Sequence, residues 1–289
     1  MMHFKFSKSL DYQLEAIKAV VEVFDTGKNL LQSEAIFEMQ SASKIIANEL
    51  EVTPEKILSN VQTIQNQNKI EPVTQTLDSM DFSIEMETGT GKTYVYLRTI
   101  LELHQKYGLR KFIILVPSVA IREGVIKSIS QLKGHFEELY GLDITKSCFE
   151  YDSAKLSRVR EFTQSLDLKV MIMTVQSFAG NERLVMRQKP DRFNGEQPIE
   201  LIAQTNPVVI MDEPQNMESD LAKNAISDLH PLCKLRYSAT HKEIYNLLYR
   251  LTPVDAYRKG LVKKIAVYGV KDESAGSFVF RVNAIETKK

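Results

Sequence analysis

The sequence predicts an α/β fold with three layers, in which a mostly parallel central sheet is covered by helices on both faces. From residue 82 onward, short and continuously apolar runs alternate with longer helical patterns. Strands that are buried on both faces are typical of parallel sheets. The clearest of these runs, residues 111–116, reads Lys-Phe-Ile-Ile-Leu-Val and ends at Pro117. A glycine-rich turn at residues 89–91 joins another apolar run directly to a helical pattern.

The overall composition fits a globular protein with no net charge. The chain has 289 residues, with 37 acidic and 37 basic side chains, so a nucleic-acid partner would have to be held by a local basic groove. The two cysteines, Cys148 and Cys233, have no CxxC spacing, which excludes a zinc module and argues against a disulfide framework. No apolar stretch is long enough to span a membrane, and no signal peptide is present. We therefore expect a soluble, cytoplasmic protein.

Residues 1–80 are expected to form an N-terminal helix followed by a helical insertion. Residues 9–24 carry apolar side chains at helical spacing. Residues 25–80 are rich in Gln, Asn, Ser and Thr and show no strand pattern, and helices are expected near residues 33–50 and 54–65. Thr53 and Pro54 suit the N-cap and the first position of the second of these helices.

Residues 81–260 are expected to form the main α/β domain, and residues 261–289 the start of a following segment. Ligands of such sheets bind at the carboxyl ends of the strands, and the candidate chemistry described below follows these ends. Strands are expected at residues 82–86, 111–116, 168–174, 208–211 and 235–238, helices at 93–107, 120–140, 242–251 and 254–260, and further strand-like segments at 265–270 and 277–284.

The run Gly89-Thr90-Gly91-Lys92-Thr93 has the core pattern of a phosphate-binding loop. Two glycines let backbone N–H groups curl around an anion, and a helix that starts at Gly91 directs its positive dipole end at the same anion. The Lys92 ammonium can reach the outer phosphates of ATP, and the Thr93 hydroxyl can bind Mg²⁺. The complete pattern has glycine where this chain has Met86, so a glycine-rich turn with a chance Lys-Thr pair is the alternative. The residues expected to bind nucleotide are Thr88, Gly89, Thr90, Gly91, Lys92 and Thr93.

A pair of carboxylates, Asp212-Glu213, follows the apolar residues 208–211. Asp212 can hold Mg²⁺ through water, and Glu213 can orient and polarise a water that attacks a phosphate. An acidic surface turn is an equally good interpretation of this segment by itself. Adjacent parallel strands would, however, bring the Thr93 hydroxyl and Asp212 to one Mg²⁺. Lys92, Asp212 and Glu213 are therefore the expected catalytic residues, with ATP and Mg²⁺ as cofactors.

Polar residues follow three other expected strands. Such groups suit contacts with a phosphodiester backbone or coupling to the hydrolysis site, and helix capping is the alternative for each segment. In the N-terminal helix, the Gln13 amide can pair with an adenine edge, although a glutamine on a helix is usually only solvated. The candidates for DNA contact or coupling are Ser118, Arg122, Gln176, Ser238 and Thr240.

In their order along the chain, these segments resemble the motifs of the first RecA-like motor lobe of superfamily 2 helicases and translocases. In that superfamily, alanine rather than glycine is common at the position of Met86. The segment Asp212-Glu213-Pro214-Gln215 is similar to the distinctive motif II of the Res subunit of type III restriction–modification enzymes. Residues 86–96, 116–125 and 235–242 also resemble that family, whereas residues 25–75 match it less clearly.

The resemblance implies a subunit that hydrolyses ATP, engages double-stranded DNA and cuts it with a C-terminal nuclease, in complex with a modification (methyltransferase) subunit. No second RecA-like lobe, which normally supplies an arginine finger, and no nuclease core follow in this sequence. We therefore expect an N-terminal fragment of a longer protein that is weakly active by itself. Two other interpretations remain open: a superfamily 2 helicase or translocase without a nuclease, and a non-catalytic nucleotide-binding or interaction module.

Overall fold

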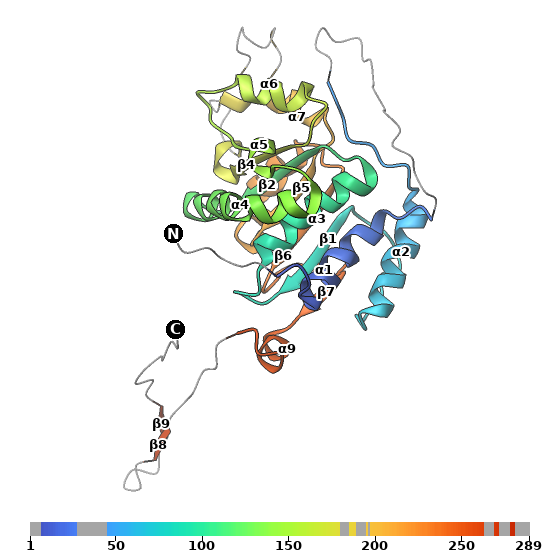
Figure 1. Ribbon diagram of the computed structural model, residues 1–289, viewed down its shortest axis with the longest axis vertical. Helices are drawn as coiled ribbons and strands as arrows, with labels where there is room; N and C mark the ends of the chain where they lie inside the picture. Colours follow the sequence, from blue (N-terminus) through green and yellow to red (C-terminus); the bar gives the residue numbers. More distant parts are fainter. Residues whose placement is uncertain are drawn as a thin grey trace.

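A seven-stranded, entirely parallel sheet forms the centre of the computed structural model, with the strand order β3-β4-β2-β5-β6-β1-β7 (Figure 1). The structure describes residues 7–27, 45–179, 185–188, 195 and 197–262, and the backbone of residues 269–271 and 278–280. The expected α/β class with a parallel sheet is confirmed. The strands are β1 (Asp81–Met86), β2 (Lys111–Val116), β3 (Cys148–Glu150), β4 (Lys169–Thr174), β5 (Val208–Asp212), β6 (Cys233–Ser238) and β7 (Tyr249–Leu251).

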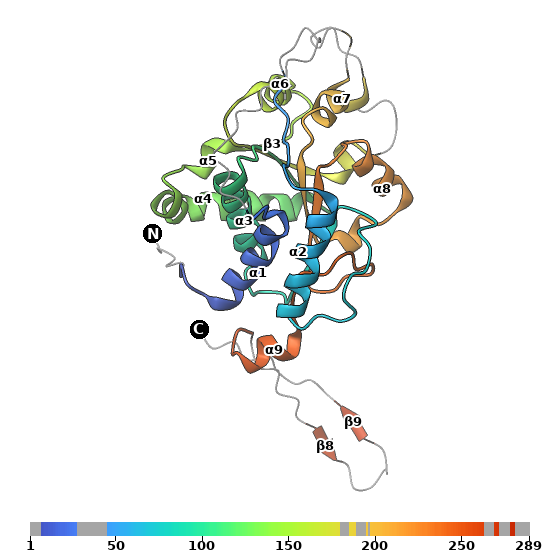
Figure 2. The same ribbon diagram turned by 90° about the vertical axis from the view of Figure 1, so that its right-hand side faces the viewer.

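Helices cover both faces of this sheet and complete the three layers (Figure 2). The side chains of β2 alternate between two hydrophobic clusters: Phe112 and Ile114 belong to one, Ile113 and Leu115 to the other. A strand that is buried on both faces has to be apolar at successive positions, which explains the sequence of this run. The first cluster includes residues of α1 (Asp11–Val21), α2 (Pro54–Gln67), α3 (Lys92–Tyr107) and α4 (Val119–Tyr140), and the second includes residues of α6 (Ser157–Gln164), α7 (Pro198–Ala203) and α8 (Asp220–Ser227).

Most of the helices that capping signals and periodicity predict near the sheet are present. The Thr53 side chain accepts a hydrogen bond from the Lys56 N–H and caps α2, and Pro54 occupies the first helical position. Gly108 directly follows α3, and its φ of +69° lies in the left-handed region that favours glycine. The expected helix at 9–24 is α1 followed by a 3₁₀ turn at Glu22–Phe24, and the expected helix at 254–260 is α9 (Pro253–Arg258).

The helix expected near residues 33–50 is wrong where the structure tests it. Residues 28–44 lie outside the described residues, and residues 45–52 form an extended segment without helix. Its backbone donors bond to distant parts of the chain: the Ile46 N–H donates to the Thr163 carbonyl in the last turn of α6 at 2.8 Å, and the Asn48 N–H to the Thr205 carbonyl at 2.9 Å. These tertiary hydrogen bonds take the place of the bonds within a helix, and the local sequence contains no sign of them.

Asn48 holds this extended segment against the amino-terminal ends of the sheet strands. Its side-chain oxygen accepts the N–H groups of Arg110 at 2.8 Å and Lys111 at 3.0 Å. Its side-chain nitrogen donates to the carbonyls of Lys111 at 2.7 Å and Asn206 at 3.1 Å. One buried amide therefore satisfies backbone groups where β2 begins and just before β5.

The helix expected at residues 242–251 is also wrong. The chain instead runs along the free edge of β1: the Tyr245 N–H donates to the Ser83 hydroxyl at 3.0 Å, and the Leu248 N–H donates to the Ser83 carbonyl at 2.9 Å. Asn246 has a φ of +39°, which a helix does not contain, and β7 then pairs with β1. Pairing with an open sheet edge therefore overrides the local helical pattern.

Several short elements have no clear sequence signal. Each has at most eight residues, which leaves too few positions for a periodic pattern to stand out. They are β3, β7, α5 (Ile144–Ser147), α6, α7 and α8.

Near the C-terminus, β8 (Gly269–Lys271) and β9 (Phe278–Phe280) form an antiparallel pair that overlaps the two expected strand-like segments, although β8 continues one residue past the first of them. The other residues of these segments lie outside the described part. The division into residues 1–80, 81–260 and 261–289 stays a prediction. Among the described helices, none is both long enough and apolar enough to cross a membrane.

The contacts of Asn48 lead to a prediction about stability. We expect Asn48→Ala to lower the free energy of unfolding by about 3 kcal/mol, because it leaves several buried backbone groups without partners. Urea unfolding of the chain measures this, with Asn66→Ala at an exposed position of α2 as the control. Equal unfolding midpoints for the two variants would contradict the role of Asn48.

Candidate functional site

The predicted phosphate loop connects β1 to α3. β1 ends at Met86 and α3 begins at Lys92, so residues 87–91 form the turn between them. Gly89 and Gly91 have φ values of +81° and +93°, a conformation that residues with a Cβ rarely adopt. The first N–H groups of α3, which have no partner within the helix, and the positive end of its dipole meet at this loop. Thr88 and Gly89 are exposed, so the loop is open to an anion.

Helix α1 supports the predicted phosphate loop through two side chains. The Tyr12 hydroxyl and the Gln13 side-chain nitrogen both donate to the Thr90 carbonyl, each at 3.0 Å. A Cβ at Gly91 would lie 2.5 Å from the Gln13 nitrogen, so close packing as well as backbone conformation favours glycine here. Gln13 is therefore a support of the phosphate loop, and its contact with adenine stays a prediction.

Lys92 connects the loop to the carboxylates after β5. Its ammonium lies 3.1 Å from a Glu213 carboxylate oxygen and donates to the Met86 carbonyl at 3.3 Å. Only 10% of the Lys92 side chain is exposed, so this ion pair is screened less than one on the open surface. The predicted phosphate loop and the Asp212-Glu213 pair thus form one site.

The strand arrangement at this site differs from the expected one. β1 and β5 are not adjacent, because β6 lies between them. Glu213 nevertheless reaches Lys92, since its φ of +54° turns the chain sharply after β5 and its N–H donates to the Tyr237 carbonyl of β6 at 2.9 Å. A non-glycine residue in this conformation is held at a cost of order 1–3 kcal/mol and is characteristic of functional sites.

The two carboxylates have opposite pKa shifts. Burial, followed by the neighbouring Glu213 charge, raises the pKa of Asp212 to about 6, although Lys92 and a hydrogen bond from Tyr96 act against the rise. Burial also acts to raise the pKa of Glu213, but hydrogen bonds from Gln215 and the Lys92 charge outweigh it and lower that pKa below its ordinary value. Glu213 is thus ionised at neutral pH, whereas Asp212 is close to its protonation range.

Ser238 belongs to the same site. Its hydroxyl lies 3.1 Å from a Glu213 carboxylate oxygen and 2.8 Å from both the Gln215 side-chain oxygen and the Thr240 carbonyl. The Gln215 nitrogen in turn donates to Glu213 at 2.7 Å. Since no helix begins after Thr240, the alternative that residues 238–240 cap a helix is wrong. Ser238 is fully buried, which suits coupling and excludes direct contact with a large ligand.

The other candidates lie beside β2 and β4, away from Lys92 in the sheet order. Ser118 is exposed and caps α4, and Gln176 is exposed and donates to the Pro117 carbonyl at 3.2 Å. Arg122 forms an ion pair with Glu150 at 2.8 Å, so its charge is already partly balanced. The structure therefore places these residues on one surface, with capping as an observed role of Ser118.

The donor atoms of the site fit Mg²⁺. Oxygen donors are what this ion prefers, and it commonly uses one or two carboxylates together with substrate phosphates. The Tyr96 hydroxyl donates to Asp212 at 3.4 Å, and Tyr96 lies one helical turn after Thr93 in α3, so Thr93 and Asp212 are both close to this side chain. Both described cysteines are free, and no group of three or more His, Cys, Asp or Glu side chains suited to a metal occurs among the described residues.

Two residues of the site, Tyr96 and Gln215, lie in segments that resemble the family but are not among the candidate site residues expected from the sequence. Tyr96 follows Thr93 by one helical turn, which the sequence shows. Its contact with Asp212 becomes visible only in the tertiary structure. Gln215 is visible in the sequence as part of the acidic segment, but its contacts with Glu213 and Ser238 depend on the turn at Glu213.

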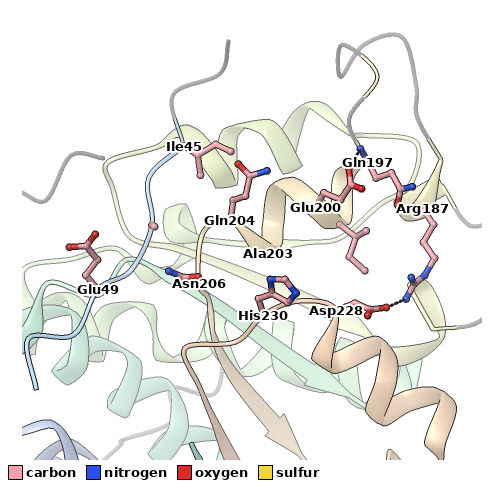
Figure 3. A pocket seen from close by; sticks show the side chains of 12 residues that line it. Ile45, Glu49, Arg187, Gln197, Glu200, Ala203, Gln204, Asn206, Asp228 and His230 are labelled. Carbon is pink, nitrogen blue, oxygen red and sulfur yellow. Dashed lines mark hydrogen bonds and ion pairs between the residues drawn. The ribbon is translucent and has the colours of Figure 1, made fainter. Parts of the chain in front are cut away.

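A cavity of about 780 Å³ lies at the opposite end of the sheet (Figure 3). Its lining includes Glu49 of the extended segment, Asn206 before β5 and His230 before β6. Arg187 in its wall is paired with Asp228 at 2.6 Å. Because it faces the amino ends of the strands, this cavity is separate from the phosphate loop.

Comparison with known proteins gives the following matches. A family model described as "Type III restriction enzyme, res subunit" matches residues 7–243. The EcoPI Res subunit of Escherichia phage P1 is 29% identical over 284 residues, which cover 91% of this chain and 29% of that protein. The StyLTI Res subunit of Salmonella typhimurium is 31% identical over 250 residues, which cover 73% of this chain and 25% of that protein.

The chain therefore spans less than a third of the length of these curated relatives. Among solved structures, the Sulfolobus solfataricus SWI2/SNF2 ATPase core in complex with dsDNA matches 71% of this chain and 35% of that chain, with 14% identity and a TM-score of 0.37. At that score the likeness adds no argument about the site.

The raised pKa of Asp212 leads to a prediction about stability and pH in metal-free buffer. The folded-state pKa of about 6 exceeds the ordinary 3.8, so the folded chain binds more protons between these values and its stability falls as the pH rises through that window. At pH 7 the cost is about 3 kcal/mol. We expect Asp212→Asn to stabilise the chain at pH 7 and to lose this advantage near pH 4, as measured by urea unfolding.

The exposed Asp78→Asn in the loop before β1 controls for the loss of one negative charge. An Asp212→Asn effect that is destabilising at pH 7, or the same at both pH values, would contradict the prediction.

Proposed function

The chain belongs to the type III restriction enzyme Res subunit family, and from that premise we propose that it is the ATP-binding and ATP-hydrolysing motor lobe of such a subunit. The observation that carries the proposal is the 3.1 Å contact between Lys92 and Glu213. It joins a loop suited to phosphates with a carboxylate suited to positioning water, at the carboxyl edge of one sheet. A simple structural turn would not require both features together.

In the proposed mechanism, backbone N–H groups of residues 89–93 and the Lys92 ammonium bind the phosphates of ATP. Lys92 is shared between Glu213 and the Met86 carbonyl, and phosphate oxygens offer this ammonium a stronger partner. Thr93 and Asp212 would hold Mg²⁺, which neutralises charge on the phosphates. Gln13 is proposed to contact the adenine, in addition to its bond to Thr90.

Glu213 is proposed to orient the attacking water. Its lowered pKa keeps it ionised at neutral pH, so it can accept a hydrogen bond, and then the proton, from that water. The water oxygen attacks the terminal phosphorus while the bond to the leaving ADP breaks. Gln215 and Ser238, which bond to the same carboxylate or to each other, fix its direction. An arginine finger from an opposing lobe would complete the stabilisation of the transition state.

The proposal extends to the partners of the complete protein. Double-stranded DNA is the proposed partner of the surface that carries Ser118, Arg122 and Gln176, and of Thr240, which follows β6. Ser238 is proposed to couple this surface to the hydrolysis site, because it is buried against Glu213. Cleavage is assigned to a nuclease outside this chain, and a modification (methyltransferase) subunit is the proposed protein partner.

The first test concerns Lys92. We expect Lys92→Ala to weaken binding of a fluorescent ATP analogue by roughly 10- to 100-fold, because a charged hydrogen-bond partner of the phosphates is lost. Equilibrium titration of the chain measures this, with urea unfolding as a check of the fold. Lys106→Ala removes a more exposed lysine from the same helix and serves as the control. Unchanged binding in Lys92→Ala would refute the assignment of the loop.

The second test separates binding from hydrolysis. We expect Glu213→Gln to bind the ATP analogue within about threefold of wild type, since no phosphate contact is assigned to Glu213. In the complete Res–modification assembly the same change should slow ATP hydrolysis by roughly 10²- to 10⁴-fold, the usual contribution of a general base. Lost binding with retained turnover is the pattern that contradicts the role of Glu213.

A further inference from the structure

Tyr96 is a buried residue of α3 to which the proposed mechanism assigns no role. Its side chain is fully buried, and it follows Thr93 by one helical turn. We propose that Tyr96 is a positioning residue whose hydroxyl holds Thr93 and Asp212 in the arrangement that receives Mg²⁺. This inference rests on the proposed function and adds a role for a residue that touches neither nucleotide nor water.

The geometry of the sheet creates the need for such a residue. Thr93 follows β1, Asp212 ends β5, and β6 lies between these strands. Two strand spacings correspond to about 9–10 Å, so the two candidate ligands are not brought together by strand pairing. Tyr96 crosses this gap, because it lies one helical turn after Thr93 in α3 and its hydroxyl donates to a carboxylate oxygen of Asp212 at 3.4 Å.

The ring of Tyr96 is fixed in position by the strand beneath it. Tyr96 and Tyr237 of β6 pack edge to face, with ring centroids 5.6 Å apart and an angle of 61° between the rings. Such pairs are favourable beyond the area that they bury. The hydroxyl is therefore presented from a rigid part of the core, and the 3.4 Å contact with Asp212 acts mainly on direction rather than through a strong bond.

A core tyrosine that merely needs a hydrogen-bond partner is the competing explanation. Tyr237 is such a residue: its side chain is fully buried and its hydroxyl donates to Thr99 at 3.3 Å, one core residue to another. The Tyr96 hydroxyl differs because it donates to Asp212, a candidate metal ligand, from a position one helical turn after Thr93, the other candidate ligand. Burying a hydroxyl is costly unless it is hydrogen-bonded, so the choice of Asp212 as the partner connects the core to the site.

The contrast between the two tyrosines supplies the experiment. In Tyr96→Phe the ring remains and only the hydroxyl is removed. We expect the Mn²⁺ affinity of the chain in the presence of ADP, measured by electron paramagnetic resonance, to fall roughly 10-fold, as is typical when a partner of a metal ligand is lost. Affinity for a fluorescent ADP analogue in EDTA should stay within about twofold, since no phosphate contact changes.

Tyr237→Phe is the matched control, because it removes an equally buried hydroxyl from the same aromatic pair. We expect its Mn²⁺ affinity to equal that of wild type. A Tyr96→Phe chain with wild-type Mn²⁺ affinity, or an equal loss in both variants, overturns the inference and leaves the proposed function in place. A wild-type chain that binds nucleotide neither with metal nor without it overturns the proposed function, and the role of Tyr96 with it.

Discussion

The common direction of β1, β6 and β5 is the constraint on which the site depends. In the register of the sheet, Ser238 of β6 lies opposite Glu85 of β1, and Tyr237 of β6 lies opposite Asp212 of β5. Three carboxyl ends therefore reach one edge at the same level, and the loop after β1 faces the turn after β5. A shift of one residue in a parallel pair would exchange the two faces of a strand and separate Lys92 from Glu213.

That edge also concentrates groups that are costly to bury. Asp212 is buried beside another carboxylate, Glu213 has a left-handed backbone conformation, and the Lys92 ammonium is almost covered. Removing one partner of the partly buried Lys92–Glu213 pair would destabilise the fold more than replacing both, because it leaves a charge without a partner. The supports come from β6, whose Tyr237 carbonyl and Ser238 hydroxyl both contact Glu213. β6 thus lies between the strands that carry the two motifs and also supports Glu213 in its contact with Lys92.

Segments outside the sheet stabilise its two ends. At the carboxyl end, α1 holds the phosphate loop through Tyr12 and Gln13, which share the Thr90 carbonyl. At the amino end, the extended segment 45–52 satisfies backbone groups of β2 through Asn48. Both supports come from the first 80 residues, so this part of the sequence contributes to the α/β core rather than only preceding it.

The sequence alone determined the class of fold and identified the candidate residues of the site. Apolar runs of strand length predicted most strands, because a parallel strand is buried on both faces. The predicted phosphate loop and the Asp212-Glu213 pair were recognisable from residue type and spacing. Only the tertiary structure decided what depends on distant partners. Hydrogen bonds to other parts of the chain made residues 45–52 extended, and the free edge of β1 replaced a helix at 242–251 with β7. The strand order placed β6 between the two motifs, and that separation gave Tyr96 its position between Thr93 and Asp212.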